Sequence, residues 1–402
     1  MKLHYSLMQS VIETVYTIFA ENKMADKAIQ QVLRSNKKFG SRDRAFIAEN
    51  TYEIVRWWRL LHFINGTNID NCHPATLWKL LGIRLRLIKW ELPEIIEFKG
   101  ISRNNVEKKL MEAKSIRKVY HSIPDWLDEM GKGEIKEEWD VLLPYLNDQA
   151  PVSIRVNTLK TNFTELKIRL KKEDIDIASV PNVQDAAYLA ERVNIHATAA
   201  FKDGLFELQD PGSQLIGSYL QVKPGMRVID ACAGAGGKSL QLACLMENKG
   251  TIIALDTEEW KLEELKKRAK RNGIHNIDAR PIAGKTIKRL RESADAVLLD
   301  VPCSGLGVLR RNPDAKWKLG PEFIENIKKT QAEILQNYSQ MVKPSGKLVY
   351  ATCSILPSEN EIQVSSFLSK NSNFKLISQQ HVNPMNHGFD GFYMALIERN
   401  EK

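Results

Sequence analysis

The chain has 402 residues, enough for two or three domains at about 150 residues each. Its composition, 43% hydrophobic and 27% charged, is that of a globular protein and excludes an intrinsically disordered chain. The formal net charge is +9, which favours a polyanionic partner such as a nucleic acid, although a basic soluble enzyme is an equally ordinary explanation.

The spacing of the cysteines and the length of the apolar segments indicate the cellular compartment in which the protein is expected. The chain has five cysteines and no Cys-x-x-Cys pair, so we expect neither a disulfide framework nor a zinc cluster, and no metal is predicted. No stretch reaches the roughly 18 apolar residues that a membrane span needs, and the first residues lack the features of a secretory signal. We therefore expect a cytoplasmic protein without membrane contact.

The pattern of apolar residues divides the chain into three predicted domains. Helical spacing dominates residues 1–120, where strand signals are scarce. In residues 121–200, linker helices lead to the segment 152–157, which alternates like a strand and indicates a small α+β module. From 201 to 402, strands and helices alternate regularly, which is typical of an α/β fold with a mostly parallel, doubly wound sheet.

A glycine-rich turn, residues 232–238, follows the strand at 226–230 and precedes a helix from Ser239. Glycines allow positive φ and a close approach of the backbone to a ligand, and sheets of this kind bind nucleotides at the carboxyl ends of their strands. Asp256 ends the next strand, where a carboxylate can accept hydrogen bonds from both hydroxyls of a ribose. The pattern predicts a nucleotide-like cofactor.

Two other ligands fit parts of this turn. Residues 237–239 end it like a phosphate-binding P-loop, and 297–300 resembles the magnesium-binding strand of nucleoside triphosphatases, but the first P-loop glycine would be Cys232. The glycine spacing of nicotinamide dinucleotide sites also fails. S-adenosylmethionine (AdoMet) carries no phosphate and tolerates both departures, so we expect AdoMet as the cofactor.

Two cysteines directly follow strands of the same predicted sheet. Cys303 comes after the strand that ends at Asp300, and Cys353 comes after the strand 346–352. A lone free cysteine is usually a small buried residue. Two cysteines at the carboxyl ends of strands in one sheet, where sheets of this kind bind their ligands, instead indicate a nucleophilic site. We hypothesise that Lys238 lowers the pKa of the attacking thiol.

Together these motifs resemble the RsmB/Nop2/Sun (Fmu) family of RNA 5-methylcytosine methyltransferases. The stretches that carry the likeness are 230–238, 300–305, 352–354 and 358–361, supported by 209–214, 310–317 and 390–392. The resemblance implies a class I AdoMet methyltransferase fold for the last domain. The N-terminal helices resemble the NusB-like domain of the bacterial RsmB branch, which methylates small-subunit ribosomal RNA.

The resemblance also implies roles for individual residues. Cys353 corresponds to the nucleophile, Cys303 to the thiol that helps to release the product, and Asp300 and Lys238 complete the catalytic group. The implied AdoMet contacts are Cys232, Ala233, Gly234, Ala235, Gly236, Gly237, Lys238, Asp256 and Asp300. The family usually carries an Asp after its third strand, where this chain has Ala283, which predicts a different or weaker hold on the adenine end of AdoMet.

The implied chemistry needs these residue types. A thiolate that adds to C6 of a cytosine makes C5 reactive toward a methyl donor, and Asp300 can neutralise the charge that develops near N3. A catalytically weak or inactive RNA-binding or ribosome-assembly factor with a methyltransferase fold is the alternative, for which Ala283 is the only hint.

RNA contacts are expected in two places. Arg155 and Asn157 lie in a stretch that resembles the family's small RNA-contacting module. A second, basic and aromatic set follows the Pro-Cys turn: Arg310, Arg311, Lys316 and Trp317. Such a segment suits phosphate contact and stacking on an extruded base, although a solvated loop is the plainer explanation.

Overall fold

The computed structural model describes residues 4–401, which form two compact units. The first comprises the chain up to Asp148 together with Leu309–Pro321. The second comprises Gln149–Val308 and the chain from Glu322 onward. Residues 309–321 are therefore an excursion: the chain leaves the second unit after Val308, joins the first, and returns at Glu322.

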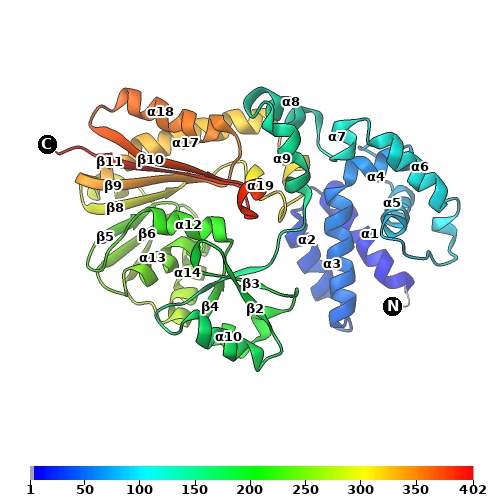
Figure 1. The fold of residues 1–402 in the computed structure, drawn as a ribbon, viewed down its shortest axis with the longest axis horizontal. Helices are drawn as coiled ribbons and strands as arrows, with labels where there is room; N and C mark the ends of the chain where they lie inside the picture. Colours follow the sequence, from blue (N-terminus) through cyan, green and yellow to red (C-terminus); the bar gives the residue numbers. More distant parts are fainter. Residues whose placement is uncertain (1–3, 402) are drawn as a thin grey trace. The chain divides into compact units, whose positions relative to one another are not determined.

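The first unit is all-helical (Figure 1). Its helices are α1 (Tyr5–Phe19), α2 (Ala25–Ser35), α3 (Ser41–Arg56), α4 (Trp58–Asn65), α5 (Pro74–Leu87), α6 (Arg103–Ala113), α7 (Arg117–Tyr120), α8 (Asp125–Glu134), α9 (Glu138–Asn147) and, from the excursion, α16 (Ala315–Lys318). In α1 the buried Leu7, Val11, Val15 and Ile18 recur at the three- to four-residue spacing that places them on one face. The linker helices expected after residue 120 belong to this unit.

The second unit begins with a small antiparallel sheet in the strand order β2-β3-β1-β4. Its elements are β1 (Ser153–Val156), α10 (Phe163–Lys171), β2 (Ile177–Val180), β3 (Val183–Leu189), α11 (Ala199–Lys202) and β4 (Phe206–Leu208). Ile154, Leu166, Ala187 and Phe206 are fully buried in its core. The predicted α+β module is thus present.

A seven-stranded sheet fills the rest of the second unit, in the order β10-β11-β9-β8-β5-β6-β7. Its elements are α12 (Pro211–Tyr219), β5 (Arg227–Asp230), α13 (Gly237–Leu245), β6 (Thr251–Asp256), α14 (Glu259–Asn272), β7 (Ile277–Pro281), α15 (Thr286–Arg289), β8 (Ala294–Asp300), α17 (Pro321–Tyr338), β9 (Val342–Thr352), α18 (Glu361–Lys370), β10 (Phe374–Val382), α19 (Pro384–His387) and β11 (Phe392–Arg399). Strands β5 to β9 are parallel; β11 pairs with β9 antiparallel, and β10 pairs antiparallel with β11 at the edge of the sheet.

Both faces of this sheet are covered. Val228 packs in one cluster with α12, α13 and α14, whereas its neighbour Ile229 packs in another with α17 and α18, and Figure 1 shows these helices on opposite sides. Successive strand residues point to opposite faces, so a sheet buried on both needs continuous apolar strands. The predicted doubly wound α/β fold is confirmed. Within residues 4–401, no helix has the length and apolar character to cross a bilayer.

Candidate active site at the carboxyl edge of the sheet

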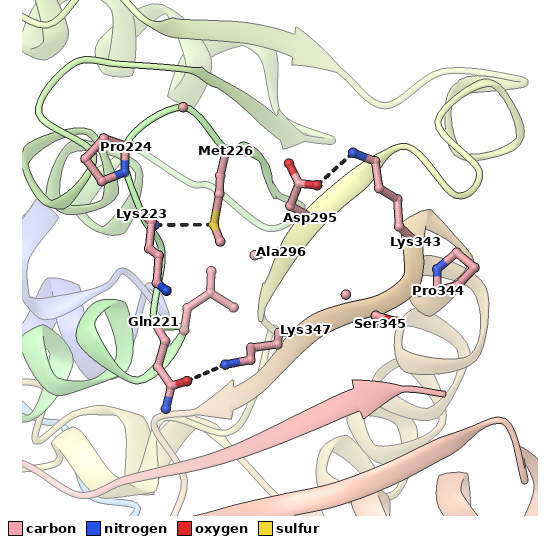
Figure 2. A pocket seen from close by; sticks show the side chains of 13 residues that line it. Gln221, Lys223, Pro224, Met226, Asp295, Ala296, Lys343, Pro344, Ser345 and Lys347 are labelled. Carbon is pink, nitrogen blue, oxygen red and sulfur yellow. Dashed lines mark hydrogen bonds and ion pairs between the residues drawn. The ribbon is translucent and has the colours of Figure 1, made fainter. Parts of the chain in front are cut away.

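The two edges of the large sheet differ in chemistry. Asp230, Asp256 and Asp300 each end a parallel strand and therefore meet at the carboxyl edge. The opposite, amino edge carries an open pocket of about 700 Å³ (Figure 2). There Lys343 pairs with Asp295 at 2.7 Å. None of the predicted site residues lines that pocket, so the candidate site lies at the carboxyl edge.

The glycine-rich turn has the backbone conformation that the sequence predicts. Gly234 and Gly236 have φ of +53° and +87°, and Gly236 caps the start of α13. A Cβ at Gly236 would lie 2.4 Å from Leu265, which explains the glycine there. Beside Gly234 and Gly237 the space is open, since a Cβ at either would meet no atom within 4 Å. The turn thus leaves room for a ligand against its backbone.

Asp256 braces this turn. Its Oδ2 accepts a 2.8 Å hydrogen bond from the Gly234 N–H, and its Oδ1 accepts one of 2.9 Å from the Glu258 N–H. Each carboxylate oxygen has a second lone pair, so the group can still accept hydrogen bonds from two hydroxyls. This fits the expected ribose contact.

Asp230 is buried and only half satisfied. Its Oδ2 accepts a 2.6 Å hydrogen bond from Ser239, but Oδ1 has no partner among the described residues. Burial raises the pKa of Asp230 to about 7. The pKa of the adjacent Cys232 thiol is also raised, first by burial and then by the carboxylates of Asp230, Asp300 and Asp256. Three acidic groups around one turn suit a positively charged ligand, and AdoMet carries its charge on sulfur and nitrogen.

Lys238 and Asp300 form an ion pair, with 2.6 Å between Nζ and Oδ2. Burial lowers the pKa of Lys238, but the charge of Asp300 and its hydrogen bond outweigh this, and the pKa is raised overall. Cys353 also interacts electrostatically with the Lys238 ammonium. A positive charge therefore lies within reach of the predicted nucleophile.

The two cysteines are in direct contact: the sulfur atoms of Cys303 and Cys353 lie 3.1 Å apart. The Cys353 N–H points at the Cys303 sulfur at 3.3 Å, and both side chains are partly exposed. If both cysteines served only as small core residues, no contact between their thiols would be expected. Instead, the turns after β8 and β9 bring them together beside Lys238 and Asp300.

Comparisons with known proteins assign the fold to a family. The family model for 16S rRNA methyltransferase RsmB/F matches residues 218–398, and the RsmF/B-like ferredoxin-like domain matches residues 123–196. Ribosomal RNA small subunit methyltransferase B of Vibrio vulnificus is 34% identical over 284 residues, covering 68% of this chain and 66% of that protein. The chain belongs to the RsmB/F family of methyltransferases.

More distant likenesses extend over the whole chain. The probable ribosomal RNA small subunit methyltransferase B of Synechocystis is 28% identical over 424 residues and covers 93% of this chain and 95% of that protein. The crystal structure of PH0851 has a TM-score of 0.83 at 25% identity and covers 99% of this chain and all of that one. Family membership decides for the methyltransferase and against the P-loop and nicotinamide alternatives.

In this RsmB/F chain, the residues expected to contact RNA from the small module are buried. Arg155 is 3% exposed and donates a 2.8 Å hydrogen bond to the Gly237 carbonyl oxygen. Asn157 is 2% exposed and donates to the carbonyl oxygens of Gly204 and Asn272 at 2.7 and 3.0 Å. Both side chains join the module to helices α13 and α14 that cover the large sheet, so in this structure they are not available to RNA.

Residues 310–317 belong to the helical unit and do not form the solvated loop that the sequence allows. Lys316 is 1% exposed, and its Nζ donates to the Arg56 carbonyl oxygen at 3.0 Å and to Asn147 at 2.9 Å. Trp317 donates a 2.7 Å hydrogen bond to the Val55 carbonyl oxygen. Arg310 is 7% exposed, and Arg311 is half-buried. Lys316 and Trp317 therefore anchor the excursion, a role that sequence reasoning missed.

Sequence reasoning also missed residues close to the site. Tyr338, at the end of α17, has its pKa raised by burial and then by Cys232 and Asp256, so its phenol lies near the cofactor turn. Glu359 is fully buried beneath the two cysteine turns. Tyr338 belongs to none of the motifs, whereas Glu359 lies in the stretch 358–361, which carries the family resemblance without assigning this residue a role. Ala283 is exposed and places no carboxylate after β7.

Proposed function

We propose that this chain transfers a methyl group from AdoMet to C5 of a cytosine in small-subunit ribosomal RNA, through a covalent bond between Cys353 and C6 of the base. One observation carries the proposal: the sulfur atoms of Cys353 and Cys303 lie 3.1 Å apart, near the Lys238–Asp300 ion pair. Family membership supports methyl transfer, and the names of the relatives support the RNA class. The net charge of +9 suits a polyanionic substrate.

The cofactor residues hold a cation. AdoMet, when bound, supplies an electrophilic methyl group on a positively charged sulfur. Gly234 and Gly237 offer the open backbone face, Asp256 accepts the ribose hydroxyls, and the unpartnered Oδ1 of Asp230 attracts positive charge. Tyr338 borders the same turn.

Cys353 acts first. Its thiolate forms a bond to C6, and the electron pair displaced from the C5=C6 bond comes to rest on N3, where a proton must be supplied. We assign this proton to Asp300 and Lys238, which share a 2.6 Å hydrogen bond. C5 then has enamine character and can take the methyl group. The Lys238 ammonium also interacts electrostatically with Cys353.

Cys303 acts last. The C5 proton must leave, its electron pair must re-form the C5=C6 bond, and the C6–S bond must break to release Cys353 as a thiolate. The proton on N3 returns to the Asp300–Lys238 pair. We assign the proton removal to the thiolate of Cys303, which forms when Cys303 first releases its own proton to solvent. Its pKa is raised well above the usual value, first by the hydrogen bond with Cys353 and then by burial. Once Cys353 is bonded to C6, its sulfur is an uncharged thioether. The hydrogen bond between the two thiols then no longer raises the pKa of Cys303, at the stage where Cys303 must accept a proton.

RNA contact by this chain is part of the same proposal. Of the six side chains that the sequence predicts to contact RNA, those of Arg155, Asn157 and Lys316 are hydrogen-bonded inside the protein. Arg311 remains a candidate phosphate contact because part of its side chain is exposed. The substrate class therefore rests on family membership and net charge.

A direct test uses the full chain, tritium-labelled AdoMet and unmodified 16S rRNA, followed by digestion to nucleosides. We expect the label in 5-methylcytidine, no incorporation by Cys353→Ala, and full incorporation by Cys72→Ala, whose thiol lies in the helical unit. Label in another nucleoside, or incorporation by Cys353→Ala at the wild-type rate, contradicts the proposal.

The alternative, an RNA-binding or assembly factor with weak or no catalysis, has one observation in its favour. Ala283 leaves the turn after β7 without the acidic group that the resemblance leads one to expect. That alternative predicts RNA binding without detectable AdoMet binding or methyl transfer. Calorimetric titration with AdoMet separates the two proposals before any RNA is added.

A further inference from the structure

A buried carboxylate lies beneath the two cysteine turns, and none of the steps above uses it. Glu359 ends the short 3₁₀ turn η5 (Pro357–Glu359) and is 0% exposed. Its two oxygens accept four hydrogen bonds, all from uncharged groups: the Ser304 N–H at 2.9 Å, the Ser304 hydroxyl at 2.5 Å, the Ser354 hydroxyl, and the Gln331 amide at 2.8 Å.

The partners of Glu359 are the residues that follow the two cysteines. Ser304 comes directly after Cys303, and Ser354 comes directly after Cys353. One carboxylate oxygen, Oε1, accepts from both serine hydroxyls and so joins the two turns at a single atom. The two serine hydroxyls also lie 3.2 Å from each other.

We propose that Glu359 is a positioning residue for the proposed methylation: its buried carboxylate clamps the turn after Cys303 to the turn after Cys353 and so holds the two sulfur atoms in contact. This inference rests on the proposed function, because only that function gives the contact between the sulfur atoms a purpose.

Further hydrogen bonds make the clamp rigid. Gln331, on α17, donates to Glu359 and also, at 3.1 Å, to the carbonyl oxygen of Pro302, the residue before Cys303. On the other side, Asn360 donates to the Ser354 carbonyl oxygen at 3.1 Å and accepts from the Thr352 hydroxyl at 2.5 Å. Both cysteines are thus held from the residue before and the residue after.

The charge of the carboxylate also acts on the Cys303 thiol. Glu359 is among the groups that raise the pKa of Cys303, after the hydrogen bond with Cys353 and burial. The positive Lys238, in contrast, interacts with Cys353. The carboxylate therefore helps to keep Cys303 protonated before the reaction begins. A neutral clamp would join the turns but would not raise the pKa of Cys303.

The test measures the geometry of the thiol pair without RNA. Diamide accepts two electrons and two protons, becomes the hydrazine, and leaves an S–S bond between two adjacent thiols. Peptide mapping then reports the rate at which the Cys303–Cys353 disulfide forms. We expect Glu359→Ala to slow this reaction at least about tenfold relative to the native protein, because separated thiols meet rarely.

Glu359→Gln separates position from charge. An amide of the same shape can retain its oxygen at the Ser304 N–H and Gln331, so disulfide formation should stay within about twofold of the native rate. In methylation, Glu359→Ala should lower kcat by about 100-fold with little change in KM for RNA. For Glu359→Gln, we expect the pH profile of kcat to shift, which a merely structural role would not produce.

Asp128→Ala is the matched control. Asp128 is also a buried carboxylate, 6% exposed, but it accepts from Trp139 in the helical unit, so its loss should leave the disulfide rate unchanged. If Glu359→Ala does not fold, Ser304→Ala and Ser354→Ala serve in its place. Each removes one hydroxyl hydrogen bond to Glu359 and should slow the formation of the disulfide.

Disulfide formation by folded Glu359→Ala, or by both serine variants, at the native rate would overturn the proposal. If the proposed function is wrong, the native protein will form the disulfide but methylate no RNA. The disulfide rates of the variants would still show whether Glu359 holds the two turns together.

Discussion

The Gly307 N–H donates a 2.9 Å hydrogen bond to the carbonyl oxygen of Cys353. Gly307 lies four residues after Cys303, in the 3₁₀ turn η3 (Leu306–Val308), and its own carbonyl oxygen accepts from the Gly391 N–H at 2.7 Å. Two backbone hydrogen bonds thus connect the Pro-Cys turn to Cys353 and to Gly391, which precedes β11. No side chain fits between them: a Cβ at Gly307 would lie 2.1 Å from the Gly391 carbonyl oxygen.

Gly307→Ala should therefore displace Cys303 from Cys353. We expect kcat for RNA methylation to fall about 100-fold, because a shift of roughly 1 Å at a reacting group has effects of that size. AdoMet affinity should be unchanged, since the cofactor turn lies after a different strand. Gly133→Ala is the control: its added methyl meets no atom within 4 Å. Equal kcat in both variants would show that the close packing at Gly307 does not matter for catalysis.

The two cysteine variants should fail in opposite ways. Cys353→Ala should form no covalent protein–RNA complex, because the atom that bonds to C6 is gone. Cys303→Ala should accumulate a complex that survives a denaturing gel, because the adduct forms but is not resolved. A complex from Cys353→Ala and none from Cys303→Ala would reverse the assignment of the two roles.

AdoMet affinity should depend on pH through Asp230. The pKa of this carboxyl is raised by burial to about 7, so below that pH the site must lose a proton to present a negative charge to the cofactor. Affinity should therefore rise with pH, by up to about tenfold per unit, and level off above pH 7. Titration calorimetry between about pH 5.5 and 8.5 measures this, and Asp230→Asn should make the profile flat. A flat profile for the native protein would contradict the prediction.

The raised pKa of Asp230 also makes the free energy of unfolding depend on pH. Folded Asp230 binds its proton more tightly than the unfolded chain does, whose value is near 3.8. Between pH 3.8 and about 7 the folded state therefore holds more protons, and the contribution of this group to the free energy of unfolding falls as pH rises. The contribution should be absent in Asp230→Asn, which urea titration of both proteins measures.

Lys316 should make the helical unit more stable at alkaline pH. Burial lowers its pKa well below the usual 10.5, and the charge of Arg56 lowers it further. Between the lowered value and 10.5 the unfolded chain binds the extra proton, so stability relative to Lys316→Met should rise with pH across that window. Urea unfolding at neutral and alkaline pH tests this, and a constant difference would indicate a normal lysine.

Local patterns were sufficient for the cofactor turn and the strand ends. A doubly wound sheet is encoded by continuous apolar strands alternating with amphipathic helices, and the turn after its first strand is marked by glycines such as Gly236. Asp256, Asp300 and Cys353 lie at strand ends, and parallel strands bring their carboxyl ends to one edge. Chain order was therefore enough to predict which residues gather there.

Burial and distance were decided by the tertiary structure alone. Lys316 and Trp317 have the composition of an RNA contact, yet their partners, the carbonyl oxygens of Arg56 and Val55, lie about 260 residues earlier in the chain. Glu359 lies in the stretch 358–361 that carries the family resemblance, but its role depends on four hydrogen bonds that form only in the folded chain. The sequence by itself determined the fold, the cofactor turn and the two thiols, because their signals are local in the chain. Which charged side chains stay available to a ligand depends on contacts between distant segments, and these form only when the chain packs.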